Sequence, residues 1–177
     1  MYLMLATRPD IAYAVNKTAQ YSTCYDLSHW TAVKRIIRYI KGTQTFKLRL
    51  GLSGGLSLSG ACDADWGGDI DDRRSTGGYL FWIANGLISW QTRKQSTVAT
   101  SSTQAEYQAL SNATKEALWI QALLGEIGFL QEATVIQQDN QSTITLANNP
   151  INHNRTKHID IAHHFIRECI EENKIAL

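Results

Sequence analysis

The stretch Ala61-Cys62-Asp63-Ala64-Asp65-Trp66-Gly67-Gly68-Asp69 decides how the chain is organised. Residues i and i+2 of a strand share a face, so Asp63 and Asp65 are expected to point the same way. The two glycines that follow predict a turn. Carboxylates on one face of a strand end can bind a hard cation such as Mg²⁺, which prefers oxygen ligands. Taken alone, the stretch is more typical of an acidic surface turn, because Asp69, Asp71 and Asp72 continue the run of aspartates.

The segments around this stretch predict an α/β sheet with helices packed on it. A first strand ends at the acidic stretch, and further strands are predicted at residues 76–83, 87–90, 134–139 and, as an opening only, 174–177. Asn85-Gly86 between two apolar runs is a strong hairpin signal. Residues 45–50 also alternate and predict a half-buried strand before a Gly/Ser-rich linker. An antiparallel meander followed by parallel crossovers is therefore expected.

Helices are predicted from apolar spacing and from residues that cap helix ends. The first helix is expected from Asp10, its N-cap, to Tyr21, and the second from its N-cap Ser28 to Gly42. A capping box at Thr103-x-x-Glu106 is expected to open a long helix that ends at Gly125 or Gly128. Two further helices are expected from Asn140 to Pro150 and from Asp160 to Asn173. Ala105, Ala109, Ala113 and Ala117 give the long helix an apolar stripe.

Composition places the chain among ordinary globular proteins. It has 177 residues, 44% apolar and 19% charged, and a net charge of +1. Residues 1–50 carry +6 and the others −5, so two parts with different roles are expected. Three widely spaced cysteines predict neither a disulfide framework nor a zinc site. No signal peptide or membrane span is apparent, so an intracellular protein is expected.

Basic residues form a stripe on the second predicted helix: Lys34, Arg35, Arg38 and Lys41. Such a stripe can lie along a phosphate backbone, which predicts nucleic-acid binding. A solvated helix face is the alternative interpretation of the same pattern.

Three carboxylates fall at comparable places in the predicted sheet. Asp63 ends a strand, Glu106 lies in the first turn of the long helix, and Asp139 ends the fourth strand before a helix N-terminus. If the two strands run parallel side by side, their carboxyl ends adjoin, which is where open α/β sheets bind ligands. An all-carboxylate set selects Mg²⁺ or Mn²⁺ over zinc, and a pair of such ions suits phosphodiester cleavage. Taken singly, Glu106 can instead be a capping residue and Asp139 an Asx turn.

Several longer motifs resemble, in order, the ribonuclease H region of copia-type retrotransposon polyproteins. They are Asp63-Ala-Asp65-Trp66, Asp72-Arg-Arg-Ser-Thr-x-Gly-Tyr79, Ile88-Ser-Trp90, Ser101-Ser-Thr-x-Ala-Glu106-Tyr107, Asp139-Asn-Gln-Ser142 and Thr156-Lys-His-Ile-Asp-Ile161. The first segment, with Tyr2-Leu-Met-x-Ala-Thr-Arg-Pro-Asp10, His29-Trp30 and Arg38-Tyr39-x-Lys-Gly42, resembles the end of the reverse transcriptase portion of the same polyproteins.

The resemblance implies a ribonuclease H-like fold, with three antiparallel strands, then parallel strands, and flanking helices. It implies a helical remnant of the reverse transcriptase at residues 1–55 and a ribonuclease H-like domain at residues 56–177. It also implies Mg²⁺-dependent hydrolysis of RNA in RNA–DNA hybrids, with two ions held at Asp63, Glu106 and Asp139. Asp69, Asp71 and Asp72 are then expected to form only a solvated turn.

Departures from the family pattern imply an impaired enzyme. The family has a fourth catalytic Asp on a last helix after a final strand, and this chain stops at Leu177, where that strand is expected to begin. Activity is therefore expected to be weak or lost. Asp160 is a disfavoured substitute, and Asp65 is left open. A metal cluster of His153, His158, His163 and His164 is disfavoured against ordinary helix positions.

Two other functions are compatible with the sequence. One is a non-catalytic nucleic-acid-binding or interaction protein that keeps the fold and the basic helix. The other is a transposon relic without a selected role. A secreted RxLR-type effector, a class that includes copia-like ribonuclease H sequences, is disfavoured because no signal peptide and no Arg-x-Leu-Arg motif is present. The oligomeric state is not predicted.

Overall fold

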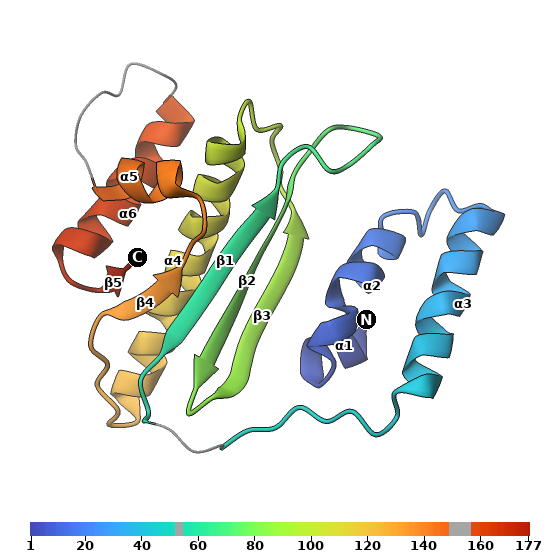
Figure 1. Cartoon of the computed structure of the whole chain (residues 1–177), viewed down its shortest axis with the longest axis horizontal. Coiled ribbons are helices and arrows are strands. Elements are labelled where there is room, and N and C mark those ends of the chain that lie inside the picture. The colour runs from blue at the N-terminus through green and yellow to red at the C-terminus, as the bar shows by residue number, and fades with distance from the viewer. Residues whose placement is uncertain (52–54, 149–156) are drawn as a thin grey trace.

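Five strands form one mixed sheet in the order β3-β2-β1-β4-β5 in the computed structural model of the chain (Figure 1). The strands are β1 (Ser59–Asp65), β2 (Thr76–Ile83), β3 (Gly86–Lys94), β4 (Thr134–Gln137) and β5 (Ile175–Ala176). The structure describes residues 1–51, 55–148 and 157–177, and in the last range it describes side chains from residue 162 onward. β1, β2 and β3 pair antiparallel, and β4 pairs parallel with β1 and β5. The expected mixed sheet, with three antiparallel strands followed by parallel strands and flanked by helices, is confirmed.

The β2–β3 hairpin forms where it was predicted, but its turn lies one residue earlier. Ala84 and Asn85 occupy the turn with φ of 50° and 59°, and Gly86 is already the first residue of β3. Positive φ at both central residues matches the twist of the two strands. A register shift between Phe81 and Trp82 accompanies this placement.

Helix α4 (Ser102–Glu126) covers one face of the sheet and supplies much of the core. The predicted stripe of Ala105, Ala109, Ala113 and Ala117 is buried. Small side chains let the helix backbone approach the strands closely. Gly60 of β1 leaves space for the ring of Phe81, its partner on β2. A Cβ atom at Gly60 would overlap the ring of Phe81, which is fully buried.

The start of α4 differs from the predicted capping box. Ser101 is the N-cap, and its hydroxyl accepts a hydrogen bond from the Gln104 backbone N–H. The Gln104 side chain reaches back to the backbone N–H of Thr100. The prediction was wrong because the cap lies two residues before Thr103, which places Thr103 inside the helix. Glu106 therefore has no capping role and faces the sheet.

Helices α5 (Gln141–Asn148) and α6 (Lys157–Glu171) pack beside α4 and complete the core. Ile166 and Cys169 of α6 are buried in the same cluster as Phe81. Cys24, Cys62 and Cys169 are free thiols, as the sequence predicted. In the part of the chain that the structure describes, no helix has both the length and the apolar character needed to cross a membrane.

The N-terminal segment forms α1 (Tyr2–Ala6), a 3₁₀ turn η1 (Pro9–Ile11), α2 (Ala12–Ala19) and α3 (Leu27–Gly42). A single helix starting at an Asp10 cap was predicted wrongly, because Asp10 lies inside the 3₁₀ turn and pairs with Arg8 at 2.8 Å. Ser28 was also wrongly predicted as a cap. Asp26 caps α3, since its carboxylate accepts from the backbone N–H groups of Ser28 and His29.

The strand predicted at residues 45–50 is wrong. The segment forms neither helix nor strand, and Phe46 and Leu50 are exposed. Its alternation is real, but none of the strands pairs with it in the described structure. Without a partner strand, alternation alone does not produce a β-structure.

The N-terminal helices lie beside β3, whereas α4 to α6 lie toward β1 and β4 (Figure 1). Met4 packs with Ile11 and Ala12 in a small core against Trp90 of β3. The Trp90 indole N–H donates to the Met4 carbonyl at 2.7 Å, and the Asn16 amide donates to the Thr92 carbonyl at 2.6 Å. The predicted domain boundary at residue 55 stays a prediction, and these contacts cross it.

Asp69 is the main correction to the predicted solvated turn between β1 and β2. Its carboxylate is 1% exposed and pairs with Lys17 of α2 at 2.6 Å and Lys94 of β3 at 2.9 Å. These two ammonium groups hold the pKa of Asp69 well below its usual range. Asp71 and Asp72 are exposed, as predicted. The buried position depends on the N-terminal helix, so no local pattern in the turn reveals it.

We expect Asp69→Asn to destabilise the protein by about 2 kcal/mol at pH 7, because it leaves two cations without their buried partner. The lowered pKa means that this contribution is fully present above the unfolded-state pKa of about 4 and is lost as the pH falls below it. Urea unfolding at pH 7 and at pH 3 measures both effects. Asp71→Asn, an exposed neighbour, is the control. Equal stability of the two variants at pH 7 would contradict the buried ion pair.

Candidate metal centre

The three predicted carboxylates converge at one edge of the sheet. Asp63 lies in β1, Glu106 in the first turns of α4, and Asp139 two residues after β4. One carboxylate oxygen from each residue lies within 4.8 Å of the other two. β1 and β4 are parallel neighbours, with Ala61 opposite Gln137, so their carboxyl ends adjoin as expected. Among the described residues, this is the one group of three or more acidic, His or Cys side chains close enough to share an ion.

The cluster is electrostatically strained in the absence of a cation. Asp63 and Asp139 are exposed, whereas Glu106 is 7% exposed. Burial and the neighbouring charge of Asp63 raise the pKa of Glu106 to about 7, with a smaller contribution from Asp139. A divalent cation placed among the three oxygens would remove this repulsion.

Gln138 and Cys62 lie beside Glu106, and neither was predicted to belong to the site. The Gln138 amide N–H donates to Glu106 Oε2 at 3.3 Å and approaches Cys62 Sγ at 3.5 Å. Its carbonyl accepts from the Asn140 backbone N–H. Burial, with the nearby carboxylates, raises the pKa of Cys62 to about 12, so the thiol stays neutral. Thr134, Ile136 and Gln138 alternate as buried residues, and this parity was the available signal for Gln138.

Asp65, whose role the sequence left open, is not part of the cluster. It is exposed, and its carboxylate accepts a hydrogen bond from the backbone N–H of Thr76 at the start of β2. A Cβ atom at Gly68 would collide with the same carboxylate. Asp65 therefore supports the turn that follows β1.

Of the disfavoured ligand candidates, the structure describes only the side chains of His163 and His164, and neither joins the carboxylates. His153 and the side chains of His158 and Asp160 lie outside the described residues. His163 is buried and stacks on Tyr107 at 4.0 Å between ring centroids, and His164 is exposed. The predicted interpretation of His163 and His164 as ordinary helix residues agrees with these positions.

The four basic residues of the predicted stripe lie on α3, on the far side of β3 from the carboxylates (Figure 1). Lys34, Arg35, Arg38 and Lys41 are all exposed. Helix α3 has no buried residue, so its basic face is open to solvent. The structure therefore presents two separate chemical features, an acidic cluster and a basic helix.

Known proteins are similar to nearly the whole chain, although no family model matches it. It is 45% identical over 175 residues to the Retrovirus-related Pol polyprotein from transposon TNT 1-94 of Nicotiana tabacum, covering 99% of the chain and 13% of that protein. Over 170 residues it is 42% identical to the Pol polyprotein from transposon RE2 of Arabidopsis thaliana, covering 96% of the chain and 12% of that protein. The chain thus spans a small part of these polyproteins.

A shorter relative is covered more fully. The chain is 51% identical over 120 residues to Secreted RxLR effector protein 161 of Plasmopara viticola. The aligned region covers 68% of the chain and 84% of that protein. Among solved structures, LC11-RNase H1 in complex with an RNA/DNA hybrid aligns with a TM-score of 0.48 and 10% identity, covering 67% of the chain and 79% of that structure. RNase H1 from Halobacterium salinarum NRC-1 aligns with a TM-score of 0.41 and 15% identity, covering 67% of the chain and 76% of that structure.

We expect Glu106→Gln to stabilise the metal-free protein by about 2 kcal/mol at pH 8. Because the pKa of Glu106 is raised in the folded state, the free energy of unfolding of the wild-type protein falls as the pH rises from about 4.5 toward 7. The stabilisation by Glu106→Gln should therefore be absent at pH 4. Gln keeps an acceptor for the Gln138 amide. Thermal unfolding in EDTA at both pH values measures the difference, with Glu126→Gln at the exposed end of α4 as control. A destabilised Glu106→Gln variant at pH 8 would contradict the assigned repulsion.

Proposed function

The chain belongs to the Pol polyproteins of copia-type retrotransposons, and we propose that residues 56–177 are their ribonuclease H-like domain, whose carboxylate cluster binds Mg²⁺ for hydrolysis of RNA in an RNA–DNA hybrid. The observation that carries the proposal is the convergence of Asp63, Glu106 and Asp139 within 4.8 Å. Mn²⁺ is the alternative ion. Residues 1–55 are proposed to derive from the reverse transcriptase portion, since the similarity to the Pol polyproteins extends over nearly the whole chain.

The residues present fit a hard divalent cation. All three candidate ligands are carboxylates, and the neutral Cys62 thiol nearby is no competitor for them. Bound ions in such a site supply an activated water and stabilise the leaving oxygen of a phosphodiester.

The chain's own residues prepare this site in three ways. Asp63 and Asp139 present exposed carboxylates to an approaching phosphate group or ion. Glu106 is held by α4 and oriented by the Gln138 amide, so it cannot turn away from its partners without losing a buried hydrogen bond. Its raised pKa makes it the member of the cluster that holds a proton near neutral pH before a cation binds.

A second candidate function is nucleic-acid binding without turnover, and the open basic face of α3 favours it. Lys34, Arg35, Arg38 and Lys41 have no ion-pair partner among the described residues. A helix with four free cations can contact several phosphates and release their counterions. The two functions are compatible, because the helix and the cluster lie on different parts of the molecule.

We expect Asp63→Asn to lower Mg²⁺ affinity and hybrid cleavage more than about 100-fold, because it removes a ligand rather than an outer partner. Calorimetric Mg²⁺ titration and cleavage of a labelled hybrid measure the two effects separately. Asp65→Asn is the matched control, since it removes a charge two residues away while its amide oxygen can still accept from Thr76. Undiminished Mg²⁺ binding in Asp63→Asn, or an equal loss in both variants, would contradict the assigned cluster.

We expect a fourfold charge-reversal variant to weaken hybrid binding; it carries Lys34→Glu, Arg35→Glu, Arg38→Glu and Lys41→Glu. The slope of log affinity against log salt concentration should become shallower by up to about four, because up to four phosphate contacts are lost. Fluorescence anisotropy at several salt concentrations measures the slope. Unchanged affinity and slope would exclude α3 from the interface. Retained hybrid binding by wild-type protein that shows no cleavage with Mg²⁺ or Mn²⁺ would favour the second function over the first.

A further inference from the structure

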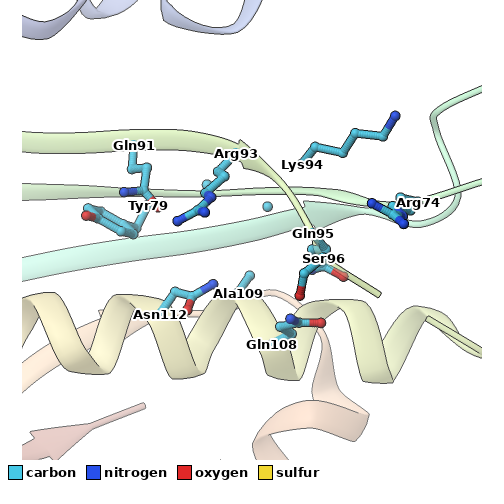
Figure 2. Close-up of a pocket in the computed structure, with 12 residues that line it drawn as sticks. Arg74, Tyr79, Gln91, Arg93, Lys94, Gln95, Ser96, Gln108, Ala109 and Asn112 are labelled. Carbon is cyan, nitrogen blue, oxygen red and sulfur yellow. The ribbon is translucent and has the colours of Figure 1, made fainter. Parts of the chain in front are cut away.

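One side of α4 is uncovered in the C-terminal half of the helix, and large apolar residues lie there. In the N-terminal half, the same side borders a polar pocket of about 320 Å³ next to the β2–β3 hairpin, lined in part by Gln108 and Asn112 (Figure 2). Helical spacing continues this side to Trp119 and Leu123. Trp119 is 60% exposed and Leu123 is 44% exposed. Neither the proposed hydrolysis nor the basic helix α3 assigns a role to this surface.

Two opposite charges flank the apolar part of this side. Lys115 lies one turn before Trp119, and Glu126 lies one turn after Ala122. Both charged residues are exposed, and neither has an ion-pair partner among the residues that the structure describes. Lys115 approaches the Phe165 ring of α6, at 5.9 Å from the ring centroid. The surface therefore presents one cation and one anion at its two ends.

The four residues on this side are complementary to their own reverse order. They are Lys115, Trp119, Ala122 and Glu126, and their spacings of four, three and four residues read the same in both directions. When a second α4 lies antiparallel against the first, Lys115 meets Glu126 of the second copy. In the same register, Trp119 meets Ala122 of the second copy. Twofold symmetry repeats both contacts, as an isologous interface requires.

The chemistry of these contacts favours the antiparallel arrangement over the parallel one. In a parallel pair, Lys115 would face Lys115 and Glu126 would face Glu126, and like charges repel. In the antiparallel pair, the large indole of Trp119 lies over a small alanine, so the two helices can approach closely. Tryptophans in such central positions dominate the affinity of interfaces, whereas exposed ion pairs at the rim mainly set orientation.

We propose that the exposed side of α4 between Lys115 and Glu126 is the interface of a symmetric dimer of this chain, in which two copies of α4 pack antiparallel. The twofold axis passes between Ile120 and Gln121, at the middle of this stretch. Glu106 lies about 20 Å from that point along the helix. The two carboxylate clusters therefore lie toward opposite ends of the helix pair, and both stay open.

The test is sedimentation velocity of the full chain across the micromolar range, in EDTA and without nucleic acid. One helix face per chain is a small interface, so we expect a monomer–dimer equilibrium in that range. Trp119→Ala is expected to weaken dimerisation at least about 30-fold. Trp30→Ala is the matched control, because Trp30 is a helical tryptophan on α3 that is 53% exposed.

A monomer at every concentration would overturn the proposal, and so would equal effects of Trp119→Ala and Trp30→Ala. Assemblies that grow beyond the dimer would overturn its symmetry in favour of a head-to-tail contact. The measurement uses neither metal nor nucleic acid. Its result is therefore independent of whether the proposed hydrolysis holds.

Charge reversal tests the antiparallel register. Lys115→Glu and Glu126→Lys are each expected to weaken dimerisation about tenfold, because like charges then face each other at both ends of the interface. An equimolar mixture of the two variants is expected to dimerise as tightly as the wild-type protein, since every charge of one variant meets the opposite charge of the other. The mixture also shows that both variants are folded. A mixture that dimerises no more tightly than either variant alone would overturn the proposed register.

Discussion

The close approach of α4 to the sheet is the constraint on which the other features depend. Alanines at every fourth position face the strands, so the helix axis can lie nearer to β1 and β2 than larger side chains would allow. That approach carries Glu106 to Asp63, and Ala109 of the same stripe lines a polar pocket between α4 and the β2–β3 hairpin. The same stripe of small residues thus borders both the carboxylate cluster and the polar pocket. Replacing it with bulkier residues would separate the groups in both places.

Aspartates that look alike in the sequence between β1 and β2 have three different roles. Asp63 joins the acidic cluster, Asp65 accepts a backbone hydrogen bond, and Asp69 is buried between two ammonium groups. Strand parity separates none of them, because all three have odd numbers. What differs is the partner that tertiary structure brings to each one. The function of each aspartate in such an acidic run therefore cannot be inferred from the run itself.

The fold was largely predictable because its signals are local. Alternation predicted the strands of the sheet, although it also predicted a false one at residues 45–50. The apolar stripe predicted α4, and the hairpin signal at Asn85-Gly86 was wrong by only one residue. The convergence of Asp63, Glu106 and Asp139 followed from two parallel strands, which the element order implied. The N-terminal part was predicted less well, since caps at Asp10 and Ser28 compete with neighbours that suit the helix ends better. Gln138 and Asp69 were missed because their partners are distant in sequence.

The burial of Asp69 also limits how this segment can be exchanged between proteins. A ribonuclease H-like unit cut out at residue 56 would take the buried carboxylate and Lys94 with it but leave Lys17 behind. It would also expose the face of Trp90 that Met4 covers. A unit that keeps these contacts therefore has to include the upstream helices that supply Lys17 and Met4. The smallest unit that keeps its buried charge paired is longer than the sheet and its covering helices.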